Sequence, residues 1–198
     1  MDRTAATLAL LRRFAQPVTP NLPASDEALP AVRALLVAAG VAYKIVGGLA
    51  VVHHGYLRFT RDVDVLVGRD GLLKIEPYLA RFAFEKKEPK RLVHTPTGVQ
   101  VDFLVEGDLV PRAASARFPA PDLISASVAD PGFVGLGPLT ELKILSGRVQ
   151  DRADVVALLK LVDEGGYLAI EAGLPATLRP ALAALREEAL EELRFGDE

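Results

Sequence analysis

Short segments with the pattern of β-strands are interleaved with short helical segments between residues 41 and 105. The strand candidates are AYKIVGG (42–48), RDVDVLV (61–67), FAFEKK (82–87), RLVHT (91–95) and VQVDFLV (99–105). Helical patterns lie at about 49–55 and 70–81, and a Pro-Thr-Gly turn separates the last two strands. This interleaving predicts an α/β (α+β) domain with a mixed, twisted sheet flanked by helices.

Helical patterns also occupy both ends of the chain. Residues 4–15 and about 26–39 precede the sheet, the second with Ser25 as its N-cap and Gly40 as its stop. Beyond Pro138 we expect helices at 139–146, 151–164 and 175–193, broken at Gly147 and at the Gly-Gly pair 165–166. The amphipathic last helix packs on the protein's own helices or offers a partner surface. We therefore expect a domain over 1–135 and a C-terminal helical region over 136–198.

Composition excludes several kinds of chemistry. The chain has 198 residues, is 50% hydrophobic and contains no Cys, so disulfides, thiolate zinc sites, iron–sulfur clusters and cysteine nucleophiles are absent. No P-loop, G-x-S-x-G or H-E-x-x-H motif occurs. The first residues do not resemble a secretory signal, and no apolar run approaches the roughly 18 residues of a membrane span. We expect a cytoplasmic protein with no membrane partner.

The net charge of −3 is distributed unevenly. Residues 121–198 carry −7, whereas a basic cluster occupies part of 81–117. Its members are Arg81, Lys86, Lys87, Lys90, Arg91, Arg112 and Arg117. Such a cluster is typical of a local nucleic-acid contact or simply of a solvated surface.

Two aspartates share one face of the strand at 61–67. Because side chains alternate along a strand, Val63 and Val65 point one way while Asp62 and Asp64 point the other, roughly 7 Å apart. Paired carboxylates of this kind suit Mg²⁺ or Mn²⁺. The alternative is that Asp62 and Asp64 are the hydrated face of a sheet.

A third aspartate, Asp102, interrupts an otherwise apolar strand. If that strand lies beside residues 61–67, three carboxylates meet, and they can hold two divalent ions for phosphoryl or nucleotidyl displacement. The alternative is an ion pair between Asp102 and an arginine such as Arg61 or Arg112.

Gly47 and Gly48 stand between a strand and a helical segment, where a phosphate can approach the backbone; alone, the pair is also explained as a turn. Gly47-Gly48 followed by Asp62-Val63-Asp64-Val65 and by Val101-Asp102-Phe103 resembles the DNA polymerase beta-like nucleotidyltransferase superfamily. The stretch GGLAVVHHGYLRFTRDVDVLV is similar to AbiEii/AbiGii-type nucleotidyltransferases, the toxins of type IV toxin–antitoxin systems. LTELKILSGRVQDRADVVALL is similar to the helical lysine motif of that group, so the resemblance covers roughly residues 41–159.

The resemblance implies a nucleotidyltransferase fold and assigns roles to individual residues. Asp62, Asp64 and Asp102 would hold two Mg²⁺ or Mn²⁺ ions, with Asp102 also helping to deprotonate the acceptor hydroxyl. Gly47 and Gly48 would bind the β and γ phosphates of the NTP. Many superfamily members have Gly-Ser at this point. Here Gly48 replaces the serine, so phosphate binding would depend more on backbone N–H groups.

Three further residues have two explanations each. Arg58 and Thr60 occupy the position of an Arg-x-Ser/Thr pair, where Arg58 binds phosphate or pairs with an acid at the strand entrance. Lys143 reaches the triphosphate or is a surface lysine. Asp151 joins the nucleotide site or caps a helix, with Asp154 completing a capping box.

The expected activity is transfer of NMP from an NTP to an acceptor hydroxyl, with release of pyrophosphate. By resemblance the acceptor is a tRNA 3′ end or a protein, and a cognate antitoxin is a further partner. The alternatives are a small-molecule nucleotidyltransferase of the antibiotic-modifying kind and a nucleotide-binding regulatory module with little turnover.

The three histidines, His53, His54 and His94, lack the spacing of metal ligands and are interpreted as packing or rim residues.

Overall fold

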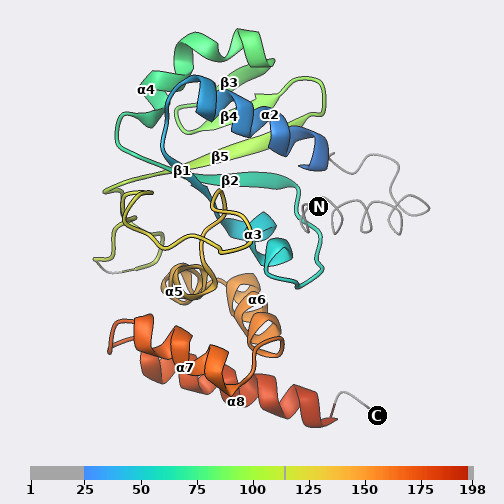
Figure 1. The fold of residues 1–198 in the computed structure, drawn as a ribbon, viewed down its shortest axis with the longest axis vertical. Helices are drawn as coiled ribbons and strands as arrows, with labels where there is room; N and C mark the ends of the chain where they lie inside the picture. The colour runs from blue at the N-terminus through green and yellow to red at the C-terminus, as the bar shows by residue number, and fades with distance from the viewer. Residues whose placement is uncertain (1–24, 114, 196–198) are drawn as a thin grey trace, which may run out of the picture.

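A computed structural model describes residues 25–113 and 115–195 of the chain. In this part of the chain seven α-helices, two 3₁₀ turns and five strands follow one another (Figure 1). The first half runs α2 (Ser25–Ala38), β1 (Tyr43–Ile45), α3 (Gly47–His53), β2 (Asp62–Val67), α4 (Gly71–Ile75), η1 (Glu76–Tyr78), η2 (Ala80–Phe82), β3 (Phe84–Glu88), β4 (Arg91–His94) and β5 (Val99–Val105). The second half runs α5 (Leu136–Ser146), α6 (Val149–Leu159), α7 (Glu164–Gly173) and α8 (Arg179–Phe195).

The strands form one mixed sheet in the order β1-β2-β5-β4-β3. The β2–β5 pair is parallel, and the other pairs are antiparallel. The alternation in the sequence explains the central strands, because the valines of β2 and β5 are buried on one face of each strand. The predicted α+β class with a mixed sheet, flanking helices and a helical C-terminal part is confirmed.

Helices cover both faces of the sheet. In Figure 1, α2 and α4 lie on one side, and α3, α5 and the remaining helices lie on the other. One hydrophobic core unites α2, α3, the sheet and part of α5, with fully buried members such as Leu35, Leu49 and Leu139. None of the helices in the described ranges is both long and apolar enough to cross a membrane.

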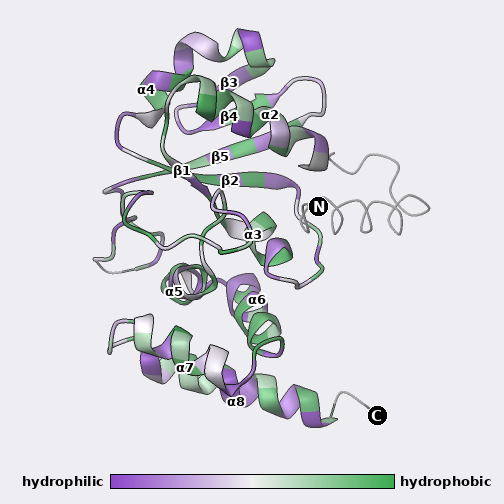
Figure 2. Ribbon diagram, viewed as in Figure 1, coloured by the Kyte–Doolittle hydropathy of each residue, from purple (hydrophilic) through white to green (hydrophobic). Residues whose placement is uncertain are grey.

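A second hydrophobic cluster lies among α6, α7 and α8, where Leu159, Ile170 and Leu182 are its central members. Figure 2 shows the hydrophobic and hydrophilic stretches alternating along α8, as in an amphipathic helix. Leu182, Leu185 and Ala189 are buried. The last helix thus packs on the protein's own helices, the first of the two alternatives considered from the sequence.

Several predicted elements differ from the observed ones. The single helix expected over 70–81 is instead the short α4 followed by two 3₁₀ turns, because Pro77 interrupts the backbone hydrogen bonding. The Gly-Gly pair 165–166 does not break a helix but lies in the first turn of α7, whose N-cap Asp163 accepts a hydrogen bond from the Gly166 N–H. The predicted helix at 4–15 lies outside the described residues.

Replacement of Phe133 tests the junction between the sheet and the segment that leads into α5. Phe133 is fully buried, and its ring stacks on His53 with centroids 4.1 Å apart. We expect Phe133→Ala to lower the free energy of unfolding by about 3–5 kcal/mol in urea denaturation. The matched control is Phe195→Ala, on a ring that is 72% exposed, which should change stability by less than about 0.5 kcal/mol. Similar losses in both variants would contradict this description of the core.

Candidate functional site

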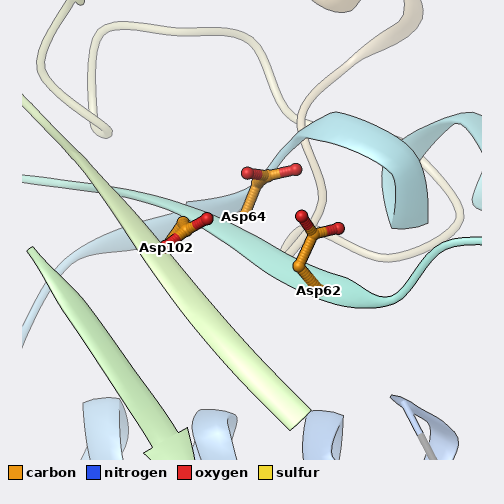
Figure 3. Close-up of side chains that lie close together, drawn as sticks. All are labelled: Asp62, Asp64 and Asp102. Atoms are coloured by element: carbon orange, nitrogen blue, oxygen red, sulfur yellow. The ribbon is translucent and has the colours of Figure 1, made fainter. Parts of the chain in front are cut away.

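Three carboxylates meet on the two adjacent strands β2 and β5. Asp62 and Asp64 project from one face of β2, and Asp102 projects from β5 beside them (Figure 3). The parallel register places Asp64 directly opposite Asp102. One oxygen of each carboxylate lies within 4.8 Å of the other two. The adjacency of these strands, on which the sequence argument depended, is therefore present in the structure.

The pKa of Asp64 responds to its burial and to the two neighbouring carboxylates. Burial, followed by the charges of Asp62 and Asp102, raises the pKa of Asp64 to about 6. Arg148 and Lys143 act in the opposite direction but do not cancel the shift. Burial and the neighbouring carboxylates thus both disfavour the charged form of Asp64, and a cation bound nearby would favour it.

Asp102 has an arginine partner that the sequence argument missed. Arg91 donates to Asp102 from Nε to Oδ1 at 2.6 Å and from Nη2 to Oδ2 at 3.3 Å. The sequence had suggested Arg61 or Arg112, but the antiparallel register of β4 and β5 places Arg91 directly opposite Asp102. Asp102 therefore both belongs to the carboxylate cluster and forms an ion pair.

The two glycines at the β1–α3 junction permit close packing against these strands. Gly47 has a φ of +60°, and a Cβ there would overlap the Asp64 carboxylate. A Cβ on Gly48 would come within 2.8 Å of Arg58 Nη2 and would also overlap Thr60. The Thr60 hydroxyl donates to Asp62 Oδ1 at 3.2 Å. The structure thus brings the Gly-Gly pair, the Arg58–Thr60 segment and two of the carboxylates together.

Lys143 is buried rather than on the surface. It is only 4% exposed, and its Nζ lies 2.9 Å from Asp151 Oδ1 and 2.6 Å from Asp154 Oδ2. Arg58 Nε lies 2.9 Å from the other Asp154 oxygen, Oδ1. Arg58 therefore pairs with an acid, as one alternative proposed, but that acid lies on α6 and not at the entrance of β2.

The capping roles predicted for Asp151 and Asp154 are wrong. Helix α6 begins at Val149, so both aspartates lie inside it, and their carboxylates bind side chains instead of the helix N-terminus. Asp151 accepts hydrogen bonds from Arg148 Nε and Ser146 Oγ, both at 2.6 Å. Burial opposes ionisation of Asp151, but the hydrogen bonds from Arg148, with the charge of Lys143, lower its pKa to about 2.

A cavity of about 230 Å³ connects the carboxylates with this buried network. Its polar lining comes from both halves of the described chain: Gly47, Asp64, Asp102, Lys143, Arg148 and Asp151. Four segments that lie far apart in the sequence thus contribute to one cavity: the β1–α3 junction, β2, β5 with the loop after it, and the α5–α6 region.

Four of the seven members of the basic cluster, Lys86, Lys87, Lys90 and Arg91, pair with nearby acids. Lys86 pairs with Glu76, Lys87 with Glu85, and Lys90 with Asp108, at distances between 2.6 and 3.2 Å. The lysines lie towards the β3 edge of the sheet, with β4 between β3 and β5. The cluster resembles a solvated, ion-paired surface, the second alternative considered from the sequence.

The histidines have structural partners, in agreement with their interpretation as packing or rim residues. His53 stacks on Phe133 and shares a 2.8 Å hydrogen bond with Ser127. His54 bonds to the Val134 carbonyl, and His94 bonds to the Thr97 hydroxyl.

Comparison with known proteins adds no family: the sequence matches no protein-family model, and no curated protein matches it. The function must therefore be argued from the arrangement of these residues.

Replacement of Gly47 tests the fit between the β1–α3 junction and the carboxylates. Gly40 supplies the matched control, because its φ of +61° is nearly the same but no atom lies within 4 Å of its Cβ position. We expect Gly40→Ala to cost about 1 kcal/mol of stability, and Gly47→Ala to cost about 2–4 kcal/mol because it also displaces Asp64. Equal losses of free energy of unfolding in urea would contradict the close packing of Gly47.

The raised pKa of Asp64 predicts that this carboxylate destabilises the metal-free protein at neutral pH. A folded-state pKa of about 6, above the ordinary 3.8, means that the contribution of Asp64 to stability falls as pH rises through that interval. Asp64→Asn should therefore raise the free energy of unfolding at pH 7.5 by about 1–2 kcal/mol without divalent ions. The gain should vanish well below pH 3.8, where Asp64 is protonated in both the folded and the unfolded chain. An Asp64→Asn protein that is less stable than the wild type at pH 7.5 would contradict the repulsion.

Proposed function

We propose that this protein is a metal-dependent nucleotidyltransferase, which transfers NMP from an NTP to a hydroxyl group. The observation that carries the proposal is the meeting of Asp62, Asp64 and Asp102 beside the Gly47–Gly48 junction. The ordered spacing of these motifs in the sequence supports the same activity.

The residues present fit a divalent cation. All three donors are carboxylate oxygens within 4.8 Å of one another, and hard oxygen ligands are what Mg²⁺ and Mn²⁺ prefer. Burial, followed by the charges of Asp62 and Asp102, raises the pKa of Asp64, and a cation bound beside it would oppose both effects. Asp62, Asp64 and Asp102 would hold two such ions, which would neutralise the triphosphate and acidify the acceptor hydroxyl.

The surrounding residues then position the NTP. We assign the β and γ phosphates to the Gly47–Gly48 junction, where the guanidinium of Arg58 and the hydroxyl of Thr60 also lie. Lys143 and Arg148 add positive charge on the α5–α6 side of the cavity. Asp151 fixes both of these cations through its own ion pairs, so its role is positioning.

The transfer itself conserves atoms and charge in a simple way. The oxygen of the acceptor hydroxyl attacks the α-phosphorus, and the bond from that phosphorus to the oxygen bridging the β-phosphate breaks. Pyrophosphate leaves on the Gly47–Gly48 side, and the hydroxyl proton passes to Asp102 and then to water. The resemblance suggests a tRNA 3′ end or a protein as acceptor and an antitoxin as partner, and these assignments stay predictions.

Label transfer from an α-³²P-NTP in the presence of Mg²⁺ tests the activity. Each NTP is incubated with total tRNA, with protein, with hydroxyl-bearing small molecules, and with the enzyme alone. We expect Asp62→Asn and Asp64→Asn each to lower the rate at least about 100-fold, because each removes a ligand of the charge-neutralising ion. The matched control is Asp70→Asn, an exposed acid that pairs with Lys74, which should keep the wild-type rate.

Two outcomes would contradict the proposal. One is the absence of Mg²⁺-dependent NTP binding by the wild-type protein. The other is label transfer that persists when both Asp62 and Asp64 are replaced.

A further inference from the structure

The cavity beside the carboxylates changes from polar to apolar along its length. Helix α5 shows the change, because Leu139 and Leu142 come before Lys143 and Ser146 along the helix and all four line the cavity. Strand β5 shows the same change, because Leu104 follows Asp102 on the same face of the strand. The loop after β5 completes the apolar part with Val110, Pro111 and Phe118.

The side from which the acceptor oxygen attacks decides which group occupies the apolar part of the cavity. In an in-line displacement the attacking and leaving oxygens lie on opposite sides of the α-phosphorus. Pyrophosphate is assigned to the Gly47–Gly48 side, so the acceptor oxygen approaches from the Asp102 side. On that side Leu104, Val110, Pro111 and Phe118 form the wall. The acceptor's neighbours are thus mainly apolar side chains.

The charges around the site disfavour an RNA chain as the acceptor. An RNA 3′ end brings a phosphodiester backbone that is normally bound by free lysines and arginines. Here Lys86, Lys87 and Lys90 are paired with acids, and Arg91 holds Asp102 and Glu88. Arg112 and Arg117 are exposed and are not among the cavity-lining residues.

The size of the cavity fits a compact group. The whole cavity measures about 230 Å³, and this volume includes the polar part assigned to the NTP. An apolar cavity of about 150 Å³ is enough to bind benzene, so the apolar part can take no more than a compact ring or branched aliphatic group.

We infer that the acceptor is a hydroxyl carried by a compact, mainly apolar group that enters the cavity between Leu104, Leu142 and Phe118. The inference rests on the proposed nucleotidyl transfer and names its acceptor class. The product is the phosphodiester of NMP with that hydroxyl, formed as the α-phosphorus releases pyrophosphate.

The test compares acceptors at equal concentration, with α-³²P-NTP and Mg²⁺ as the donor. The probes are 2-phenylethanol and tyramine as hydroxyl compounds with an apolar aromatic ring, glycerol as a polar compound without one, and total tRNA. A tyrosine-containing peptide distinguishes a protein side chain from a free small molecule as the source of the hydroxyl.

Two variants place an amide in the apolar part of the cavity. The variants are Leu142→Gln on α5 and Leu104→Gln on β5. Because both leucines are only partly buried, we expect at least one of the two variant proteins to fold. The matched control is Leu109→Gln in the same loop as Val110, because Leu109 is 53% exposed. Binding of Mg²⁺-NTP is measured for every variant.

We expect the rate with 2-phenylethanol, tyramine or the peptide to exceed the rate with glycerol at least tenfold. Leu142→Gln and Leu104→Gln should remove this preference while the Kd for Mg²⁺-NTP stays within twofold, and Leu109→Gln should behave as wild type. Equal rates with glycerol, or transfer to no apolar hydroxyl, would overturn the inference. So would label entering tRNA at a rate that neither variant changes.

A raised Kd for Mg²⁺-NTP with an unchanged KM for the acceptor would also overturn it, because the nucleoside would then occupy the apolar part. Failure of the proposed function gives a different result, since the wild-type protein would then show no Mg²⁺-dependent NTP binding at all.

Discussion

Electrostatic repulsion among Asp62, Asp64 and Asp102 is the constraint around which the rest of the site is arranged. Three like charges are held together because the parallel pairing of β2 and β5 places Asp64 opposite Asp102. The valines on the other faces of the two strands hold that pairing in the core. Gly47 permits the β1–α3 junction to pack directly on Asp64, and Arg91 neutralises part of the charge from β4. The hydrophobic core thus maintains an unfavourable cluster that a divalent cation would relieve.

A buried ion network ties the helical C-terminal part to this cluster. Arg58, which precedes β2, reaches Asp154 on α6, and Lys143 on α5 lies between Asp154 and Asp151. Removal of one partner would leave a buried charge uncompensated, so the network fixes the distance between α5, α6 and the strand that carries Asp62. Of these two cations, Lys143 also lines the polar part of the cavity. Packing between the two halves and the positive charge in the polar part of the cavity therefore both depend on Lys143.

The strands and the carboxylate cluster could be predicted because they depend on short-range patterns. Alternation fixed the face shared by Asp62 and Asp64, and an apolar strand with one acid indicated Asp102. The Arg91–Asp102 pair could also have been predicted from the sequence, because counting outward from the turn at 95–98 places these residues opposite each other. Three other features could not be predicted, because they depend on how α5, α6 and an irregular loop pack in three dimensions. They are the burial of Lys143, the Asp154–Arg58 pair and the apolar wall at Val110 and Phe118. The spacing of Asp151 and Asp154 in the sequence suggested that both cap a helix. That spacing carries no information about Lys143, which lies on the preceding helix and pairs with both aspartates.

Binding of Mn²⁺ to the protein, followed by electron paramagnetic resonance, tests the central claim most directly. The account predicts saturable Mn²⁺ binding by the wild-type protein that Mg²⁺ displaces and that NTP strengthens. Replacement of Asp62 and Asp64 together by Asn should weaken that binding at least about tenfold, whereas Asp70→Asn should leave it unchanged. Binding of equal strength in the wild-type protein and the Asp62, Asp64 double variant would show that these carboxylates do not form a metal site, and the account would then be wrong.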